Sequence, residues 1–457
     1  MHYYNINKRL WLRFLFVLTV GLSTGCKKYL DAKPDKKLVV PTTLSDASAL
    51  LDYYTRLNAF YTSMGSQSDD DFYILDDYYN TIEVKFRDRY IWNKDALSED
   101  ADWSDLYSVV QYANLALETV EKNKPSVQTL AEWNRVKGEA LFFRAYAFYQ
   151  IAQYYAVPYD PRNAEKELGI PLRLTSDVNA QNVRSNLEDT WQQILKDYKE
   201  ASLLLPTTSD PISRPNRKAA FAAMARTFLV MQDYKSAYMY ADSSLQLYHT
   251  LLDYNQLDTS SSAPFPRFNE EEVFHSEMIG AGMLGVTHWR VDSLLYQSYA
   301  HDDLRRLLFF KGIGSNPYGF KGSYSGTSGV HFNGIAVDEV FLMRAECAAR
   351  LGKAMEAMKD LNMLLKNRWK ANTFVPLTAS TPEDALEIIL IERRKELVGR
   401  GLRWYDLRRF NQDERLAHTL IRETNGKRYE LPPNDPRYTF YIPQTVIDFT
   451  GMSQNAR

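Results

Sequence analysis

The chain has 457 residues, of which 55 are basic and 57 acidic, so its formal charge is only −2. A nucleic-acid-binding protein carries a clustered basic surface, and this balance argues against that class. Because the chain contains only 2 cysteines, burial of apolar side chains rather than a framework of disulfides has to stabilise the fold.

The N-terminus has the composition of a secretory signal peptide. Three basic residues precede an apolar run of about nine residues, which is much shorter than the ~20 needed to span a bilayer. Cys26 follows small residues directly, a pattern typical of a bacterial lipoprotein, in which the cysteine becomes the new N-terminus and its thiol receives a lipid. We therefore predict residues 1–25 as a lipoprotein signal peptide and Cys26 as the lipidation site; the alternative is an ordinary signal peptide with an incidental cysteine. Removing the leader removes its three basic residues and changes the formal charge from −2 to −5.

Helical periodicity dominates the rest of the chain, after a polar tether at residues 26–37. We predict one body over residues 38–457, with irregular insertions at about 63–102 and 249–335 that contain turns and short strands. No later apolar run is long enough to span a membrane. The predicted helices are Leu44–Leu57 (with Ser45 as its cap), Trp103–Lys122, Leu130–Tyr155, Leu187–Leu205, Arg217–Met231, Tyr234–Leu247, Ala336–Leu351, Ala354–Arg368, Pro382–Gly399 and Trp404–Phe410. Loops with at most one strand are expected after Arg428.

Two helical pairs share an alternation of small and large side chains. The segments 225–245 and 345–365 place alanines where two helices approach closely, as in a tetratricopeptide hairpin. Such hairpins bury their apolar faces only by stacking on one another. In this pattern we expect Cys347 to be a small buried residue, and Trp103 and Trp191 to lie in the core.

Several motifs carry a family resemblance. They are Glu392-Arg393-Arg394-Lys395-Glu396-Leu397, Gly401-Leu402-Arg403-Trp404-Tyr405-Asp406-Leu407-Arg408-Arg409, Tyr441-Ile442-Pro443 with Gln454-Asn455, Gly138-Glu139-Ala140-Leu141-Phe142-Phe143-Arg144-Ala145, and the start Cys26-Lys27-Lys28-Tyr29-Leu30-Asp31. With these motifs the chain resembles the SusD/RagB family of outer-membrane nutrient-binding lipoproteins of Bacteroidetes. Gly399 and Arg400 depart from the family, which usually has an aromatic and then an acidic residue there.

The resemblance implies a mainly α fold, in which four tetratricopeptide-like helical pairs form a scaffold beside a loop-rich half. It also implies a lipid-anchored protein at the surface of the outer membrane. Such a protein captures an oligosaccharide or polysaccharide, or sometimes a peptide, and delivers it to a SusC-like TonB-dependent transporter. The expected partners are therefore the transporter, a glycan and the membrane, with no nucleic acid.

Motifs of an enzyme are missing from the sequence, which has no GxSxG, HExxH or Walker loop. The 7 histidines show no metal-ligand spacing, and nothing singles out a pair of glycosidase carboxylates among the 57 acidic residues. The charged block at 392–409 is better explained by ion pairs that hold the last helix on the scaffold. We therefore predict a protein that is not an enzyme.

An acidic run at Asp69–Asp77 offers several carboxylates that could bind a structural calcium. It lacks the glycine and the terminal glutamate of an EF-hand loop, so a solvated face is favoured. No cofactor is predicted.

Sugar binding requires flat apolar faces and planar polar groups, which loop residues can supply. Candidate ligand-binding residues in the two irregular insertions are Asp70, Tyr73, Tyr78, Trp92, Trp289, Tyr296, Tyr318 and Tyr324. Three other functions stay open: a peptide-binding uptake lipoprotein, a helical-repeat adaptor that binds only proteins, and a surface glycan hydrolase.

Overall fold

The computed structural model describes residues 41–278, 285, 287–313 and 316–457. The predicted signal peptide, the lipidation site Cys26 and the whole predicted tether lie outside the described residues. From Thr42 to Arg457 the chain forms one compact unit.

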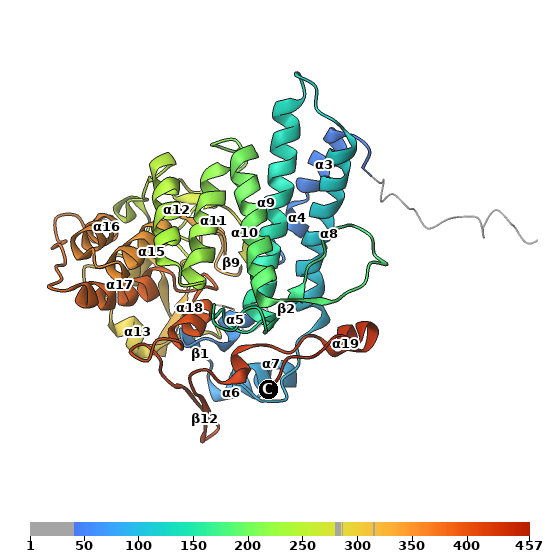
Figure 1. Ribbon diagram of the computed structural model, residues 1–457. Coiled ribbons are helices and arrows are strands. Elements are labelled where there is room, and N and C mark those ends of the chain that lie inside the picture. The colour runs from blue at the N-terminus through green and yellow to red at the C-terminus, as the bar shows by residue number, and fades with distance from the viewer. Residues whose placement is uncertain (1–40, 279–284, 286, 314–315) are drawn as a thin grey trace, which may run out of the picture. The chain divides into compact units, whose positions relative to one another are not determined.

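Eight longer helices form the scaffold, each packed against the next along the chain (Figure 1). They are α8 (Asp100–Lys122), α9 (Leu130–Tyr155), α10 (Leu187–Leu204), α11 (Arg217–Val230), α12 (Tyr234–Leu247), α15 (Val337–Arg350), α16 (Ala354–Lys366) and α17 (Pro382–Glu396). Each matches a predicted helix to within a few residues. The alanine-rich pairs α11/α12 and α15/α16 pack against one another through α12 and α15, as the tetratricopeptide pattern predicts.

The central helix of the scaffold is α9, which packs against both α8 and α10. From Gly138 to its end at Tyr155 every residue of α9 is buried, so this part of the helix is enclosed on all sides rather than amphipathic. On α8 only one stripe is buried, as predicted from its period; its members include Leu106, Val109, Val110, Ala113, Leu117 and Val120. The predicted core residues Trp103, Trp191 and Cys347 are also buried.

The prediction of a first helix over Leu44–Leu57 is wrong in its cap and in its length. It divides into α3 (Leu44–Leu51) and α4 (Tyr54–Leu57), because Tyr53 between them leaves the helical conformation. The cap is Thr43 instead of Ser45, since the Thr43 hydroxyl accepts from the Asp46 backbone and the Asp46 carboxylate accepts from Thr43. This reciprocal capping box satisfies two backbone donors at once, which a cap two residues later would not.

Among the described strands, one short antiparallel pair, β1 with β6, joins the two irregular insertions. The first contains α5 (Met64–Ser68), β1 (Phe72–Tyr73), α6 (Asp76–Tyr79) and α7 (Val84–Tyr90). The second contains η1 (Tyr254–Gln256), β4 (Glu272–Phe274), β5 (Glu277–Met278), β6 (Arg290–Val291), α13 (Ser293–Gln297), α14 (Arg305–Leu308), β7 (Phe310–Ile313), β8 (Asn316–Phe320), β9 (His331–Phe332) and β10 (Ile335–Ala336). Pairing of β1 with β6 places Phe72 opposite Val291, and the apolar residues around them form a second core beside that of the scaffold.

The C-terminal part is more regular than predicted. After α18 (Arg403–Phe410), a hairpin of β11 (Leu420–Thr424) and β12 (Lys427–Leu431) turns at Asn425-Gly426, where both residues have positive φ. Asn-Gly is the preferred sequence for such a two-residue turn. The tail continues through η3 (Pro436–Tyr438) and α19 (Gln444–Thr450). Earlier, β2 (Leu168–Pro171) pairs with β3 (Arg184–Asn186). Within the described residues, no helix has both the length and the apolarity of a membrane-spanning segment.

Candidate functional site

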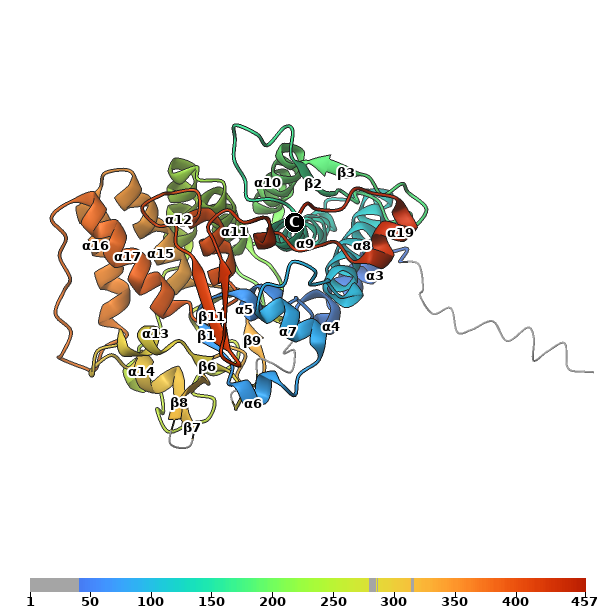
Figure 2. The ribbon, with the colours of Figure 1, turned by 90° about the horizontal axis from the view of Figure 1, so that it is seen from below.

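The elements β1, α13, α17 and the β11–β12 hairpin lie near one another in the irregular half of the protein (Figure 2). Their side chains line a groove. It consists of two cavities of about 430 and 330 Å³, and both are lined by Leu294, Arg394 and His418. We call this continuous depression the central groove. The larger cavity also has Asp70 and Tyr73 in its wall, whereas the wall of the smaller one includes the aliphatic side chains of Leu295, Leu390, Ile391 and Leu416.

Ion pairs hold the floor of the central groove. Arg403 binds Asp70 with two parallel hydrogen bonds, of 2.6 and 2.8 Å. Arg394 binds the neighbouring Asp71 at 2.9 Å and approaches the Asp70 carboxylate at 3.4 Å. Because bidentate arginine–carboxylate pairs have a defined geometry, Asp70 and the two arginines form a rigid surface. His418 completes it, with its Nε2 atom 3.6 Å from Asp70.

The charges of these groups follow from burial and from the arginines. Burial alone would raise the pKa of Asp70, but Arg403 and Arg394 outweigh it and hold the pKa well below its ordinary value. Burial raises the pKa of Asp71 to about 6, against the opposing effect of Arg394. Contact with Asp70 raises the pKa of His418. At neutral pH, the positive charges of the arginines in the floor therefore compensate the negative charge of the carboxylates.

The prediction of a solvated face for the acidic run is wrong for its first residues. Asp69 and Asp71 are each only 2% exposed. Arg394 of the 392–409 block binds the Asp71 carboxylate, and the Asp69 carboxylate accepts a hydrogen bond from the Asp71 backbone. The ion-pair explanation of that block therefore agrees with the structure, although some of its partners come from the first irregular insertion. Asp76 has another role, since it accepts hydrogen bonds from Thr424 and Asn425 at the tip of the hairpin.

Two glycines allow the chain to place Arg403 over Asp70. Gly399 and Gly401 have φ of 74° and 73°, a region that other residues rarely adopt. A Cβ at Gly399 would lie 2.5 Å from the Phe320 ring. Between them, Arg400 binds Asp338 at 2.7 Å. The two departures from the family pattern, Gly399 and Arg400, thus form a tight turn and a buried ion pair.

The predicted ligand-binding residues divide into exposed and buried groups. Asp70 and Tyr73 lie together in the central groove. Trp92 also lines it, but this side chain is only 4% exposed and its indole donates to the Ser68 carbonyl. Trp289 is 1% exposed and stacks on Phe72 at 4.1 Å, within the second core. Burial thus leaves Trp289 no face for a ligand.

Three tyrosines complete the predicted set. Tyr296 follows the groove residues on α13 and stacks on Tyr318 at 3.8 Å, and both rings are half-buried. Tyr78 stacks on the exposed ring of His288 at 3.9 Å. Tyr324 is fully buried and shares a hydrogen bond of 2.9 Å with the Tyr254 hydroxyl, so it belongs to the core.

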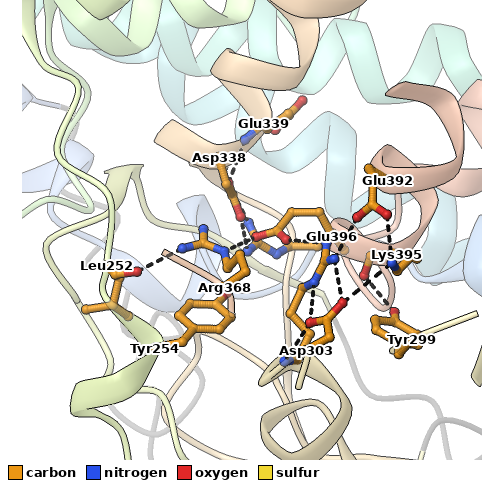
Figure 3. A network of polar contacts seen from close by, with 12 residues as sticks. Leu252, Tyr254, Tyr299, Asp303, Asp338, Glu339, Arg368, Glu392, Lys395 and Glu396 are labelled. Atoms are coloured by element: carbon orange, nitrogen blue, oxygen red, sulfur yellow. Dashed lines mark hydrogen bonds and ion pairs between the residues drawn. The ribbon is translucent and has the colours of Figure 1, made fainter. Parts of the chain in front are cut away.

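Behind the groove lies a buried charge network (Figure 3). Arg305 binds Asp303, Glu392 and Glu396 at 2.7, 2.6 and 3.0 Å. Lys395 also binds Glu392, at 2.7 Å, which is the helix neighbour predicted from the sequence. These contacts connect α17 to α14 and hold the wall of the groove that carries Arg394.

Three carboxylates of the network come within 4.8 Å of one another, namely Glu271, Asp338 and Glu396. Arginines already neutralise them, because Arg368 binds Glu271 and Glu396, and Asp338 has its own arginine partner. Burial raises the pKa of Glu271 to about 8, against the opposing effect of Arg368. The cluster therefore acts as an ion-paired part of the core.

Sequence reasoning missed several groove residues. Leu294, Ile421, Glu423 and His418 all line it, and Leu294 and Ile421 are exposed apolar side chains. Leu294 lies far along the chain from the other three, which lie together between 418 and 423 and form no recognisable motif. No signal in the sequence could have connected them.

Comparisons with known proteins agree with this architecture. A family model described as "Starch-binding associating with outer membrane" matches residues 28–229, and a model of the SusD family matches residues 320–453. Together the two segments account for most of the chain. No curated protein matches it.

Solved structures share the fold at low sequence identity. A SusD superfamily protein from Bacteroides thetaiotaomicron is 22% identical, with a TM-score of 0.75 over 91% of this chain and 100% of the other. One from Bacteroides vulgatus is 20% identical, with a TM-score of 0.73 over 91% and 99%. A SusD-like carbohydrate binding protein from Bacteroides vulgatus is 18% identical, with a TM-score of 0.67 over 90% and 97%. On the two family models and this common fold, the chain belongs to the SusD/RagB family.

Proposed function

We propose that the protein binds a glycan in the central groove and delivers it to a SusC-like TonB-dependent transporter, without performing chemistry. The observation that carries this proposal is the groove itself, whose floor is held rigid by the Asp70–Arg403 pair. Tyr73 offers an aromatic side chain and Leu294 an aliphatic one for the C–H faces of a sugar. Asp292, Glu423 and His418 supply hydrogen-bonding groups around them.

The groove also favours binding over hydrolysis. A glycosidase needs a carboxylic acid that is protonated near neutral pH and reaches the glycosidic oxygen. Asp70 lies in the groove but stays ionised because Arg403 lowers its pKa, and Asp71 is buried against Arg394. Neither is suited to donate a proton to a substrate.

The cellular location belongs to the same proposal. Lipidation of Cys26 would hold the protein at the outer membrane, facing outwards beside its transporter. A Cys26→Ala variant should leave the membrane fraction after a high-salt wash. Retention of this variant in the membrane would contradict the lipid anchor.

Calorimetric titration of the full chain in detergent tests the binding. The panel contains neutral oligosaccharides, polysaccharides and peptides, and we expect saturable binding to a glycan. Tyr73→Ala should weaken that binding at least tenfold, because a central aromatic contact contributes more than about 1.4 kcal/mol. The matched control is Tyr53→Ala, which removes an exposed tyrosine outside the groove.

Other outcomes separate the remaining functions. Saturable binding of a peptide without any glycan would favour the peptide-uptake lipoprotein. Silence across the whole panel would favour a protein-binding adaptor. Release of reducing ends from a polysaccharide would contradict the proposal of a non-catalytic protein.

A further inference from the structure

A cavity of about 320 Å³ lies between α8, the end of β2 with the segment that follows it, and α19. It shares no lining residue with the two cavities of the central groove. The helix α19 lies beside α8 (Figure 2), and its Thr445 hydroxyl donates a hydrogen bond to Asp100 at the start of α8. We call this cavity the α8–α19 pocket. Its apolar wall includes Trp103, Val110, Pro171, Val178, Val446 and Met452.

The hydroxyl and amide side chains of the α8–α19 pocket already have partners. The Tyr107 hydroxyl donates to the Pro171 carbonyl at 2.8 Å, and the Gln111 amide donates to a backbone carbonyl at 2.8 Å. The Asn182 Oδ1 atom accepts a hydrogen bond from Arg173. A sugar requires several free hydrogen-bonding groups, so this pocket is poorly suited to one.

Among the described residues of the wall, Arg173 is the one charged side chain, and no described carboxylate is paired with it. Three of its five N–H groups donate to the carbonyl oxygens of Asp177 and Ala180 and to the Asn182 amide, which are all uncharged acceptors. The Nε–H group and one N–H group of Nη2 make no hydrogen bond with a described residue. These free donors suit the oxygen atoms of a carboxylate, which binds arginine through charge-assisted hydrogen bonds.

A second arginine adds to the positive charge at this wall. Burial raises the pKa of the Tyr107 hydroxyl, and the charges of Arg184 and Arg173 oppose that rise. Arg184 donates to backbone carbonyls, among them those of Gly169 and Ser453, and no described carboxylate is paired with it. An anion at this wall would therefore be attracted by two guanidinium groups that lack a carboxylate partner.

Exposed apolar surface in the α8–α19 pocket narrows the class of ligand further. Val178 lines the pocket although it is 74% exposed, and Val446 is half-buried. A ligand with an apolar body would remove this surface from water, which a small inorganic anion would not. A neutral hydrocarbon, in turn, would leave Arg173 without a counter-charge.

We propose that the α8–α19 pocket binds a monocarboxylate with an apolar body, such as a medium-chain fatty acid or an aryl-alkanoic acid. The apolar body contacts Val110, Val446 and Met452, and the carboxylate pairs with Arg173. The proposal does not depend on the proposed function, because it involves neither the residues of the central groove nor a glycan.

Calorimetric titration of the full chain in detergent tests the site, with a blank titration into detergent alone. The probes are octanoate and 4-phenylbutyrate, and each is compared with the uncharged alcohol of the same skeleton, octan-1-ol or 4-phenylbutan-1-ol. We expect saturable binding of at least one acid, about tenfold tighter than that of its alcohol, because hydrogen bonds to charged groups are the strong ones.

Two substitutions of Arg173 separate its charge from its contacts with the loop. Arg173→Gln and Arg173→Lys both remove the planar fork that binds the loop carbonyls, but only lysine keeps the positive charge. We expect Arg173→Gln to lose the tenfold preference for the acid, and Arg173→Lys to retain most of it. The control Arg428→Gln, which removes an exposed arginine outside the pocket, should leave every affinity unchanged.

Val178→Asp gives a readout that does not depend on the loop contacts of Arg173. Because Val178 is largely exposed, this variant should keep the melting temperature of the wild type. The added negative charge should weaken binding of the acid more than binding of the alcohol.

The outcomes divide clearly. Loss of the preference in Arg173→Gln, its retention in Arg173→Lys and its reduction in Val178→Asp support the proposal. No binding of either acid, equal affinity for acid and alcohol, or a preference that survives in Arg173→Gln overturns it. An equal loss in Arg173→Gln and Arg173→Lys also overturns it, since loop geometry rather than charge would then be responsible. None of the probes is a glycan, so each outcome is independent of the titration that tests the proposed function.

Discussion

Replacement of Arg305 by methionine tests whether the charge network behind the groove stabilises the fold. The Arg305 side chain is fully buried and binds three carboxylates, so Arg305→Met leaves several negative charges without their main partner. Breaking a buried pair by removal of one partner costs about 3–5 kcal/mol. Lys395 and Arg368 still bind Glu392 and Glu396, at 2.7 Å each, so we expect the low end, about 3 kcal/mol.

The chain contains a matched control for this substitution. Arg162 binds Asp160 two residues earlier with bonds of 2.9 and 2.8 Å, the same local arrangement as Arg305 with Asp303, but its side chain is 86% exposed. Arg162→Met should therefore leave the urea midpoint unchanged. The difference between the stability losses of the two variants measures how much burial adds to the contribution of this arginine–aspartate arrangement.

The pH dependence gives the Arg305 prediction a second readout. Burial raises the pKa of Asp303 and Arg305 lowers it, so without the arginine this carboxylate binds a proton more tightly when folded than when unfolded. The stability of Arg305→Met should therefore rise as the pH falls. In urea unfolding, the free energy of unfolding that this variant loses relative to the wild type should be smaller at pH 5.5 than at pH 8. An equal midpoint for Arg305→Met and Arg162→Met at pH 8, or an equal loss at both pH values, would refute the reasoning.

Two further predictions concern a buried acid and a glycine. Burial raises the pKa of Glu271 from 4.5 to about 8, so its contribution to stability is fully present below pH 4.5 and is lost as the pH rises through 8; urea unfolding of Glu271→Gln should show a flatter pH dependence between pH 5 and 8, and a profile like that of the wild type would contradict this. Gly399→Ala should lower the free energy of unfolding by about 2–4 kcal/mol, because it adds contact with Phe320 to the strain of a positive φ. Gly352→Ala, with φ of 79° and no neighbour within 4 Å, should show the strain alone, about 1 kcal/mol; equal losses for both alanines would contradict the role of Phe320.

The scaffold could be predicted from the sequence because its helices are determined locally. The stripe on α8 and the alanines of α11 and α15 repeat with the helical period, and each helix ends near a proline, a glycine or a polar cap. The division at Tyr53 was missed because it leaves the apolar pattern intact. The helix α19 was missed because it has only seven residues and no buried face.

The candidate site was predicted only in part. The sequence indicated Asp70 and Tyr73, which lie together in the central groove, and it indicated Trp289 and Tyr324, which are buried. All four are polar or aromatic residues in irregular segments, so residue type alone cannot distinguish those that line the groove from those that are buried. Their burial depends on which distant segment each one meets.

The sequence by itself determined the helical scaffold, the leader pattern and the resemblance to the SusD/RagB family, since these depend on local period and contiguous motifs. Tertiary structure alone decided which loop residues face solvent. Pairing of β1 with β6 buries Trp289 against Phe72, and the turn at Gly399 and Gly401 directs Arg403 to Asp70. Burial and long-range pairing are properties of the whole fold, because side chains separated by hundreds of residues exclude water from one another only after the chain has closed on itself.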